Sequence, residues 1–369
     1  MTSLSSTPDL LAFISLSLLP SWRWLAVAER LRAGDPAADV FVRLAEEHWH
    51  GEPDEVDAIR ARSSAALARA RTASLTPITW SDPAYPVALA AIADPPPLIW
   101  VRGQIEALNR SAVAIVGSRA ASAYAMTVAS TLASDLAARG VAVVSGLARG
   151  VDSAAHRGAV EADGVTVAVL GSGLDVIYPP EHRTLVEDIE RRGAVVSEQI
   201  PGTPPLRWCF PLRNRIISGL SRAVVVIEAG RKSGSLITAR SALEQGREVL
   251  AVPGNILSGR NRGAHALLRD GAKIVESADD ILGELGIGSG RPGVPGSSGS
   301  TERDHRIARR DPVLDCLVPG EPSDLDEIAE RSGLTPPRLL PRLMELELQG
   351  VIARVGGGRF VRVDRNVLG

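Results

Sequence analysis

The sequence predicts an α/β fold whose centre is an extended, doubly wound and mostly parallel sheet. The first observation is a series of short β-branched runs between Ser111 and about Gly286, namely AVAIVGS, VAVVSGL, VTVAVLGSG, AVVSE, AVVVIEAG, EVLAVPG and AKIV. The second is that segments of helical length separate most of them. Strands that are apolar on both faces and alternate with helices are typical of a Rossmann-like parallel sheet covered by helices on both sides.

The chain before this region has a helical pattern. Apolar residues such as Leu10, Ile14 and Leu31 recur near helical spacing, and Pro20 and the stretch GEPDEVD divide the segment into short helices. We therefore expect a small helical domain over 1–75. The apolar run LLAFISLSLLP has no basic stretch before it and is too short to span a bilayer, so we expect a core helix, a cytoplasmic protein and no membrane partner.

The sheet domain is placed at 76–286, with its core at 111–286. It begins with a proline-rich stretch, 80–103, which we expect to be an extended connector that leads into the sheet. Residues 287–310 are rich in Gly, Ser and Pro, which is typical of a flexible linker.

The last segment, 311–369, fits a winged helix. The stretch LDEIAERSG predicts a first helix that ends at Gly333. A second helix, PPRLLPRLMELELQG, would place Leu339, Leu343 and Leu346 on one face. The stretch VIARVGGGRFVRV reads as a two-stranded wing closed by three glycines. The second helix mixes acidic and basic residues, so contact with another protein or weak auxiliary DNA binding fits it at least as well as readout of duplex sequence.

Composition limits the possible functions. The chain has 369 residues, 45% of them apolar, and a net charge of −2, so any binding of nucleic acid must rest on a local cationic patch. Cys209 and Cys316 form no metal-ligand pattern, and we expect neither a metal nor a cofactor.

The common catalytic motifs are missing. The sequence has no G-x-x-x-x-G-K-[ST], HExxH, CxxC or G-x-S-x-G, and GSGLDV is only the start of a dinucleotide fingerprint. Asp152 and His156 lie one helical turn apart, but a helix N-cap and a satisfied core histidine are the commoner roles for such residues. We therefore predict that the chain has no catalytic residue and is not an enzyme.

Cationic and small polar residues recur in four segments that we expect to be loops at the ends of strands. These segments are GSR, SGLARG, FPLRNR and GRKSGS, and loops of this kind gather at one edge of a parallel sheet. Backbone N–H groups and arginine forks there are suited to bind anions. The candidate binding residues are Gly117, Ser118, Arg119, Arg149, Phe210, Arg213, Asn214, Arg215, Lys232, Ser233, Gly234 and Ser235.

Four such loops along one edge of the sheet are suited to bind one phosphate, a nucleotide or several phosphates in a row. The breadth of this edge favours several phosphates in a row. Phe210 would then offer a stacking face to a base. Simpler roles stay open at this point, because Phe210 is as well explained as a core residue and Arg215 as the ion-pair partner of Glu228.

The motifs GSRAASAY, SGLARGVDSAAHRGAV, TVAVLGSGLDVIYPPEHRTL, FPLRNRIISGLSRAVVVIEAGRKSGSLITARSALEQGREVLAVPG and GAHALLRDGA resemble the DNA-processing protein A family, DprA or Smf. The resemblance runs in order from Ala112 to Val275. It implies a helical domain of sterile-alpha-motif (SAM-like) type, an extended Rossmann domain and a winged helix, and it assigns contact with DNA to the candidate residues above.

The resemblance also implies partners. It implies binding of single-stranded DNA with little sequence preference and loading of the recombinase RecA onto that strand, including strand coated by single-strand-binding protein. It further implies a homodimer formed through the Rossmann domain and a role in natural transformation and recombination.

Two other functions are weighed beside this one. The first is a Rossmann-type nucleotide-binding or nucleoside-monophosphate-cleaving enzyme, such as the lysine-decarboxylase-like proteins. The loop EAGRKSGS argues against it, because this loop has cations where the PGG-x-GT-x-x-E motif of that group supplies a carboxylate. The second is a DNA-binding regulator that acts through the winged helix.

Overall fold

A computed structural model describes residues 7–49, 53–287, 312–317, 322–348, 351–355 and 359–362. By the density of its internal contacts the chain divides into two compact units, Met1–Gly290 and Arg291–Gly369, which are described separately below. The linker predicted at 287–310 lies, apart from its first residue, outside the described residues.

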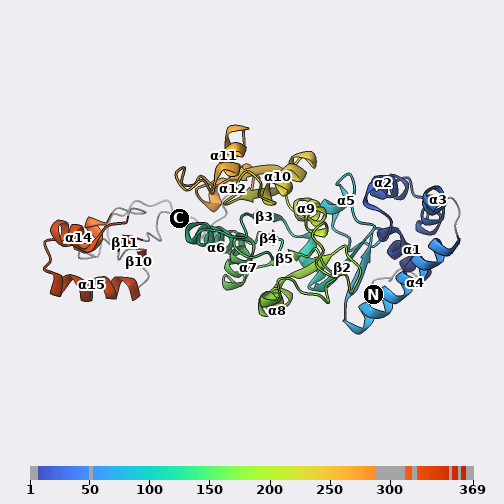
Figure 1. The fold of residues 1–369 in the computed structure, drawn as a ribbon, viewed down its shortest axis with the longest axis horizontal. Coiled ribbons are helices and arrows are strands. Elements are labelled where there is room, and N and C mark those ends of the chain that lie inside the picture. The colour runs from blue at the N-terminus through green and yellow to red at the C-terminus, as the bar shows by residue number, and fades with distance from the viewer. Residues whose placement is uncertain are drawn as a thin grey trace, which may run out of the picture. The chain divides into compact units, whose positions relative to one another are not determined.

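A nine-stranded sheet forms the centre of the described part of the first unit (Figure 1). Its strands are β1 (Thr76–Thr79), β2 (Leu98–Gly103), β3 (Ala112–Val116), β4 (Ala142–Ser145), β5 (Thr166–Val169), β6 (Ala194–Ser197), β7 (Ala223–Val226), β8 (Glu248–Ala251) and β9 (Lys273–Ile274). The strand order is β1-β2-β6-β5-β4-β3-β7-β8-β9. All seven runs predicted from the sequence are strands, β3 to β9, and they pair in parallel.

The strand order reverses next to β3. On one side β3 pairs with β4, Val113 opposite Val143, and the chain proceeds outward to β5 and β6. On the other side β3 pairs with β7, Val113 opposite Ala223, and the chain proceeds to β8 and β9. Loops that leave β3 and β7 therefore diverge over opposite faces, which opens a crevice at the carboxyl ends of the strands.

Helices cover both faces of the sheet. The helical elements of the first unit are α1 (Thr7–Ser17), η1 (Ser21–Arg23), α2 (Trp24–Arg32), α3 (Ala37–Trp49), α4 (Pro53–Thr72), α5 (Val87–Ala90), η2 (Ile105–Asn109), α6 (Ala123–Ala138), α7 (Val151–Glu161), η3 (Pro180–His182), α8 (Arg183–Arg192), α9 (Cys209–Gly219), α10 (Ser235–Glu244), α11 (Arg262–Arg269) and α12 (Ala278–Glu284). Alternate residues of each strand face opposite cores. Val113 and Ile115 pack with α6, α7 and α12, whereas Ala114 and Val116 pack with α9, α10 and α11.

The stretch 80–103 is more than the connector that the sequence predicted. Its last six residues are β2, and together with the preceding β1 they extend the sheet by two antiparallel strands. The reason is the apolar run Leu98–Val101, in which all four side chains are buried. Strand β2 pairs with β6, Val101 opposite Val196, and places Ile99 and Trp100 on opposite faces.

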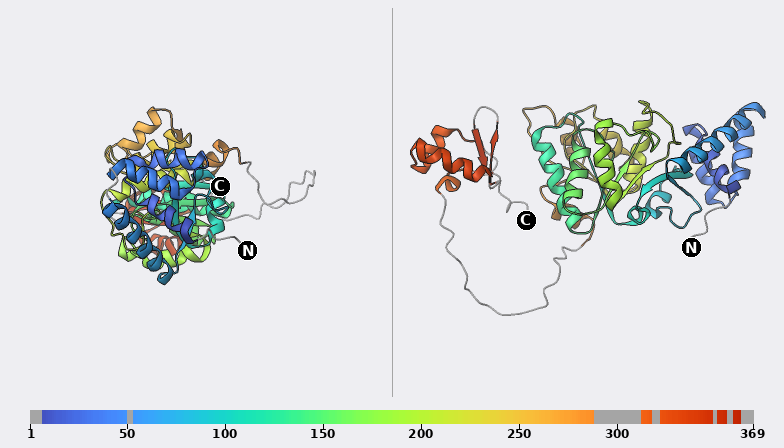
Figure 2. Two further views of the ribbon diagram at one scale, coloured as in Figure 1. Left: turned by 90° about the vertical axis from the view of Figure 1, so that its right-hand side faces the viewer. Right: turned by 90° about the horizontal axis from the view of Figure 1, so that it is seen from below.

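The N-terminal helices α1 to α4 lie beside the β1–β2 edge of this sheet (Figures 1 and 2). Helix α1 buries Phe13, Ile14 and Leu16, as predicted for a core helix. These side chains share one continuous apolar cluster with Leu98 and Trp100 of β2, and the division at residue 75 stays a prediction. Among the described residues no single helix is both long and apolar enough to cross a membrane, although the bent pair Thr7–Ser17 and Ser21–Arg32 meets the requirement jointly by length and composition.

The second unit has the elements of a winged helix, as predicted. They are α13 (Pro312–Cys316), α14 (Leu325–Ser332), α15 (Pro336–Leu348), β10 (Ile352–Val355) and β11 (Arg359–Arg362). Asp324 caps α14 by accepting a hydrogen bond from the Glu327 N–H, and Gly333 ends the helix in a left-handed conformation. The predicted apolar face of α15, Leu339, Leu343 and Leu346, is buried. The three glycines of the predicted wing lie outside the described residues.

Candidate nucleic-acid interface

A groove of about 950 Å³ lies where the strand order reverses, and we call it the switch-point groove. It is lined mainly by the loop after β3, the loop after β7 and the first turns of α9. Ten of the twelve residues predicted from the sequence line it: Gly117, Ser118, Arg119, Phe210, Arg213, Asn214, Lys232, Ser233, Gly234 and Ser235. The other two, Arg149 and Arg215, do not.

The loop after β3 is held against the start of α7. A Cβ atom on Gly117 would lie 2.6 Å from Val151 Cγ2, so only glycine permits this approach. The Ser118 carbonyl accepts a hydrogen bond from the Val151 N–H at 3.2 Å, and Gly150 passes close by with φ +77°. The loop backbone is therefore fixed, and the exposed Arg119 side chain projects from a rigid base.

The segment FPLRNR is a helix rather than the predicted loop. It forms the first turns of α9, which precedes β7 instead of following a strand. Phe210 is half-buried in the groove, with the Arg119 guanidinium 5.2 Å from its ring centre and the Tyr178 ring centre 5.6 Å away. The prediction that Phe210 lies with the cations is confirmed, although the element that carries it was predicted wrongly.

Arg213 forms the floor of the groove. Only 4% of the residue is exposed, and its guanidinium donates to the carbonyls of Gly146 and Val169, at the ends of β4 and β5. A Cβ atom on Gly146 would lie 2.3 Å from the Arg213 Nη2, so glycine is needed there to admit the guanidinium. Burial lowers the pKa of Arg213 to about 10, which still leaves it charged near neutral pH.

The loop after β7 forms the opposite wall. It turns back on itself through a hydrogen bond from the Ser233 N–H to the Gly230 carbonyl, and the Ser233 and Ser235 hydroxyls lie 2.8 Å apart at the start of α10. The Asn214 side chain donates to the Gly234 carbonyl at 3.3 Å and so ties α9 to this loop. Lys232 is exposed at the rim, and neither it nor Arg119 has an ion pair within the described part of the chain.

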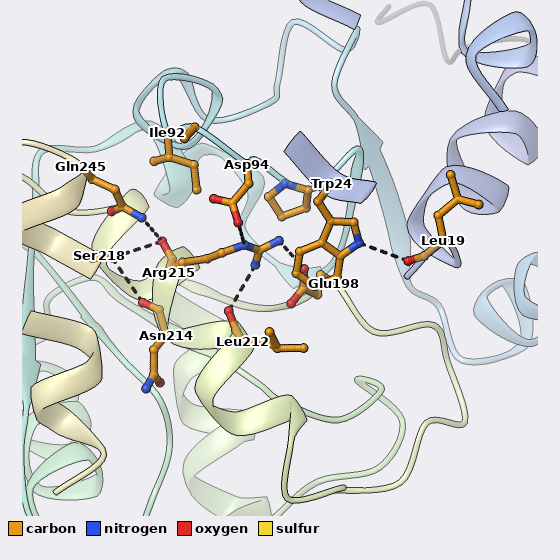
Figure 3. A network of polar contacts seen from close by, with 12 residues as sticks. Leu19, Trp24, Ile92, Asp94, Glu198, Leu212, Asn214, Arg215, Ser218 and Gln245 are labelled. Atoms are coloured by element: carbon orange, nitrogen blue, oxygen red, sulfur yellow. Dashed lines mark hydrogen bonds and ion pairs between the residues drawn. The ribbon is translucent and has the colours of Figure 1, made fainter. Parts of the chain in front are cut away.

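Arg215 points towards Asp94, Glu198 and Trp24 (Figure 3) and does not line the groove. The sequence-based prediction that it belongs to the binding site was therefore wrong. Its guanidinium donates to Glu198 at 2.8 Å and to Asp94 at 3.0 Å and lies 4.3 Å from the centre of the Trp24 ring. Burial alone would lower the pKa of Arg215, but the two carboxylates reverse the shift and raise it. Its suggested partner was also wrong, because Glu228 instead accepts hydrogen bonds from the backbone and hydroxyl of Ser122.

Arg149 lies outside the groove as well. It is exposed, and its Nε pairs with Glu181 at 2.5 Å. The neighbouring Ala148 does line the groove, so the loop after β4 reaches it without its cation. The charge of Arg149 is therefore already compensated within the protein.

Among the described lining residues, the sequence analysis missed one cation and one aromatic residue. Arg207 is exposed and belongs to the turn that leads into α9, and Tyr178 is the aromatic neighbour of Phe210. The signal for Arg207 was present in the stretch LRWCF, in which a cation and two aromatic residues lie within four positions. Cations close to aromatic side chains are typical of surfaces that bind single strands.

Asp152 also lines the groove, but its carboxylate is bound within the protein. It accepts hydrogen bonds from the backbone N–H groups of Gly146 and Ala148 at 3.2 and 3.3 Å. The N-cap of α7 is Gly150, so the predicted capping role of Asp152 was wrong. Burial raises the pKa of Asp152, while Arg213 and the two N–H groups oppose that shift.

His156 lies under α7 rather than in the groove. Its Nδ1 is 2.7 Å from the Thr166 hydroxyl, which itself donates to the Val143 carbonyl at 2.7 Å. Because the Thr166 hydroxyl hydrogen is already used in that bond, Nδ1 of His156 carries a hydrogen and donates a hydrogen bond to the Thr166 oxygen. Burial lowers the pKa of His156 to about 3, and the imidazole is neutral in the folded protein.

This buried imidazole predicts a dependence of stability on pH. Below about 6.5 the unfolded chain binds a proton at His156 that the folded chain does not, so stability is lost as the pH falls from about 6.5 towards 3. The His156→Gln variant keeps a hydrogen-bond donor for Thr166 but has no group that titrates. As the pH falls, its free energy of unfolding should therefore decrease less steeply than that of wild type, by up to about 1.4 kcal/mol per pH unit. Asp152 acts in the opposite direction, because its raised pKa favours the folded state on acidification.

The measurement is the free energy of unfolding by urea at several pH values between 5 and 7.5, for wild type and His156→Gln. The difference in free energy of unfolding between the two proteins reports on His156, because Asp152 is present in both. Parallel pH curves for the two proteins would contradict the assignment.

Together these observations describe a groove suited to a polyanion with flat, unstacked groups. Arg119 and Lys232 stand on opposite walls as exposed cations, Arg213 gives the floor a permanent charge, and Phe210 supplies an aromatic face. The one carboxylate among the described lining residues, Asp152, is already engaged.

Comparison with known proteins agrees with the fold and the motifs. A family model described as DNA recombination-mediator protein A matches residues 76–286, and the DprA winged helix domain matches residues 301–358. Protein Smf of Escherichia coli is 40% identical over 348 residues, which cover 89% of this chain and 92% of the relative. DNA processing protein DprA of Streptococcus pneumoniae is 45% identical over 204 residues, covering 55% of this chain and 72% of the relative.

Two solved structures are similar as well. The DprA structure from Streptococcus pneumoniae superimposes with a TM-score of 0.63 at 36% identity, covering 76% of this chain and 99% of that one. The Helicobacter pylori DNA processing protein A, whose structure is described in terms of its single-stranded DNA binding mode, gives a TM-score of 0.52 at 29% identity, over 57% of this chain and 95% of that one. The chain therefore belongs to the DNA processing protein A (DprA/Smf) family of recombination mediators.

Proposed function

We propose that the switch-point groove binds single-stranded DNA with little sequence preference. The observation that carries the proposal is the placement of Arg119 and Lys232 on opposite walls of a groove that also holds Phe210. Both cations are exposed, and neither has an ion pair among the described residues. Cations of this kind neutralise successive phosphates, and the aromatic ring accepts the face of an unstacked base. Neither contact depends on base identity, because each base has an aromatic face.

The geometry favours a single strand over a duplex. Phe210 is half-buried within the groove, so a base must leave its stack to reach the ring. In a duplex the bases are paired and stacked, and unstacking them costs a few kcal/mol. The Helicobacter pylori relative, whose structure is described by its binding of single-stranded DNA, supports the same choice.

A direct comparison tests this. We expect the full chain to bind an oligothymidylate more tightly than a duplex of the same length and ionic strength, measured by fluorescence anisotropy, and to bind mixed single-stranded sequences with similar affinity. Tighter binding of the duplex, or a strong preference for one sequence, would contradict the proposal. Removing residues 311–369 separates the groove from a winged-helix regulator, because a groove binder keeps most of its affinity.

An enzyme acting on nucleoside monophosphates is less well supported. Hydrolysis needs a carboxylate or other base that faces the substrate, and within the described lining Asp152 is bound by two N–H groups instead. Incubation with nucleoside monophosphates provides the check, since release of free base would favour the enzyme.

We further propose that the protein acts as a homodimer and loads RecA onto the bound strand, in recombination and natural transformation. Membership of a recombination-mediator family supports this role. A protein that holds a strand extended would lower the cost of nucleating a filament on it. Stimulation of RecA strand exchange on strand coated with single-strand-binding protein is the expected result, and its absence would contradict the loading role.

A further inference from the structure

A second groove, of about 830 Å³, lies between the N-terminal helices and the segment that leads into α9. We call it the helical-domain groove. One wall consists of the residues between α1 and α2 and one face of α4, and the other consists of residues 198–212. Nothing in the function proposed above uses it.

A short ridge is common to both grooves. Along residues 204–208 the side chains alternate: Pro205 and Arg207 line the switch-point groove, whereas Pro204, Leu206 and Trp208 line the helical-domain groove. Residues 207 and 208 form the turn that leads into α9, closed by a hydrogen bond from the Cys209 N–H to the Leu206 carbonyl at 3.0 Å. The two grooves therefore lie on either side of one short stretch of chain.

The ridge carries an aromatic side chain on the far side. Trp208 is 57% exposed, and no ring or cation stacks on it within the described residues. A ring left this exposed is available to stack on a flat ligand. Trp208 immediately precedes α9, whose second residue is Phe210, so the two grooves receive their aromatic rings from neighbouring positions.

The helical-domain groove also has a cationic wall. Arg62 and Arg69 lie two turns apart on one face of α4, with the small residues Ala65 and Ala66 between them. Arg62 is exposed and makes no ion pair among the described residues, while Arg69 pairs with Asp175 at 2.5 Å. Glu198 lies at the base of the groove, but Arg215 neutralises it.

We infer that a bound single strand continues from the switch-point groove across the ridge into the helical-domain groove. In this arrangement Trp208 stacks on a further base, and Arg207 and Arg62 contact the phosphates on either side of it. The inference rests on the proposed function, and it is favoured over a peptide ligand by the shared ridge and the unpaired cations. The N-terminal helices thereby become part of the DNA-binding surface.

The test uses the full chain and a series of oligothymidylates from about 5 to about 30 nucleotides, within and beyond the span that one such groove occupies. Wild type should bind longer strands progressively more tightly until both grooves are filled. Trp208→Ala should bind the shortest strands as wild type does and lose about 5- to 150-fold on the longest, which is the value of one stacked base. Arg62→Ala should lower the salt dependence on long strands alone, by about 0.7 log units per log unit of salt.

Trp22→Ala is the matched control, because Trp22 is 62% exposed on the same helical region but lines neither groove. It should bind strands of every length as wild type does. If Trp208→Ala binds strands of every length as wild type does, or weakens short and long strands equally, the second groove does not hold the strand and the inference is wrong.

The proposed function itself fails under different results. Absence of binding to any strand, or unchanged binding of the shortest strands by Arg119→Ala, would contradict the switch-point groove as the DNA site. A third result separates the two claims: the affinity stops rising with strand length once the switch-point groove is filled, while Arg119→Ala still weakens binding. That result would contradict DNA binding in the helical-domain groove alone, and this groove would then bind another ligand, such as a peptide.

Discussion

Replacing Arg215 with alanine is expected to lower the free energy of unfolding by about 3–5 kcal/mol. The residue is 8% exposed, and its guanidinium is bonded to both Glu198 and Asp94. Without it the buried Glu198 carboxylate would have no opposite charge in contact among the described residues. The lost contact with Trp24 adds to the effect, because this ring belongs to the N-terminal helices. The measurement is urea unfolding followed by circular dichroism.

Two controls identify the cause. Arg149→Ala removes an arginine from an exposed ion pair that solvent screens, and it should change stability far less than Arg215→Ala does. Combining Arg215→Ala with Glu198→Gln removes the stranded charge and should recover part of the loss. A loss of the same size for Arg149→Ala and Arg215→Ala would contradict the assignment of Arg215 to the interior.

The same variant separates structure from DNA binding. Under conditions in which Arg215→Ala stays folded, it should bind the shortest single strands, which fill the switch-point groove alone, as wild type does, because Arg215 does not line that groove. A specific loss of affinity for these short strands, without a loss of stability, would return Arg215 to the switch-point groove.

The strands of the parallel sheet were predictable because each is buried on both faces. Runs such as AVAIVGS and AVVVIEAG contain few polar residues, and each ends in glycine or serine where the chain leaves the sheet. The rule that ligands bind at the carboxyl ends of such strands then brought Gly117–Arg119 and Lys232–Ser235 together, and the structure confirms this. Strands β1 and β2 were not predicted, because proline-rich sequence around them indicated a connector.

The direction of the FPLRNR side chains was not predictable without knowing that the segment is helical. In a helix successive residues point about 100° apart. Arg213 therefore reaches the ends of β4 and β5, Asn214 the loop after β7, and Arg215 the N-terminal helices. Read as a loop, the same three residues were expected to face one ligand.

The ion pairs of these arginines could not be predicted from the local sequence pattern either. Arg215 lies 121 residues from Asp94 in the sequence, and Arg149 lies 32 residues from Glu181. Which cations remain available to a ligand depends on such distant carboxylates, and only the folded chain brings them together. Arg119 and Lys232 are the predicted cations that stay both exposed and without an ion pair among the described residues.

Replacing both Arg119 and Lys232 with alanine is accordingly expected to weaken binding of single-stranded DNA by roughly 100-fold at low salt. Each exposed cation that contacts a phosphate contributes about 1.5 kcal/mol, close to tenfold in affinity, and the two losses should add because the side chains stand on separate walls. Neither residue has an ion pair to lose within the described chain, so stability should change by less than about 0.5 kcal/mol. Fluorescence anisotropy with oligothymidylate gives the affinity.

The salt dependence shows whether these losses come from phosphates. Each contact with a single strand contributes about 0.7 log units of affinity per log unit of salt, so the double variant should have a slope that is shallower by about 1.4. Arg231→Ala is the control, since Arg231 is exposed beside Lys232 but does not line the switch-point groove. An unchanged slope in the double variant, or an equal loss in Arg231→Ala, would mean that the affinity comes from diffuse surface charge instead. A shallower slope confined to Arg119 and Lys232 variants would place the sugar-phosphate chain between the two walls, because counterions are released only where cations replace them.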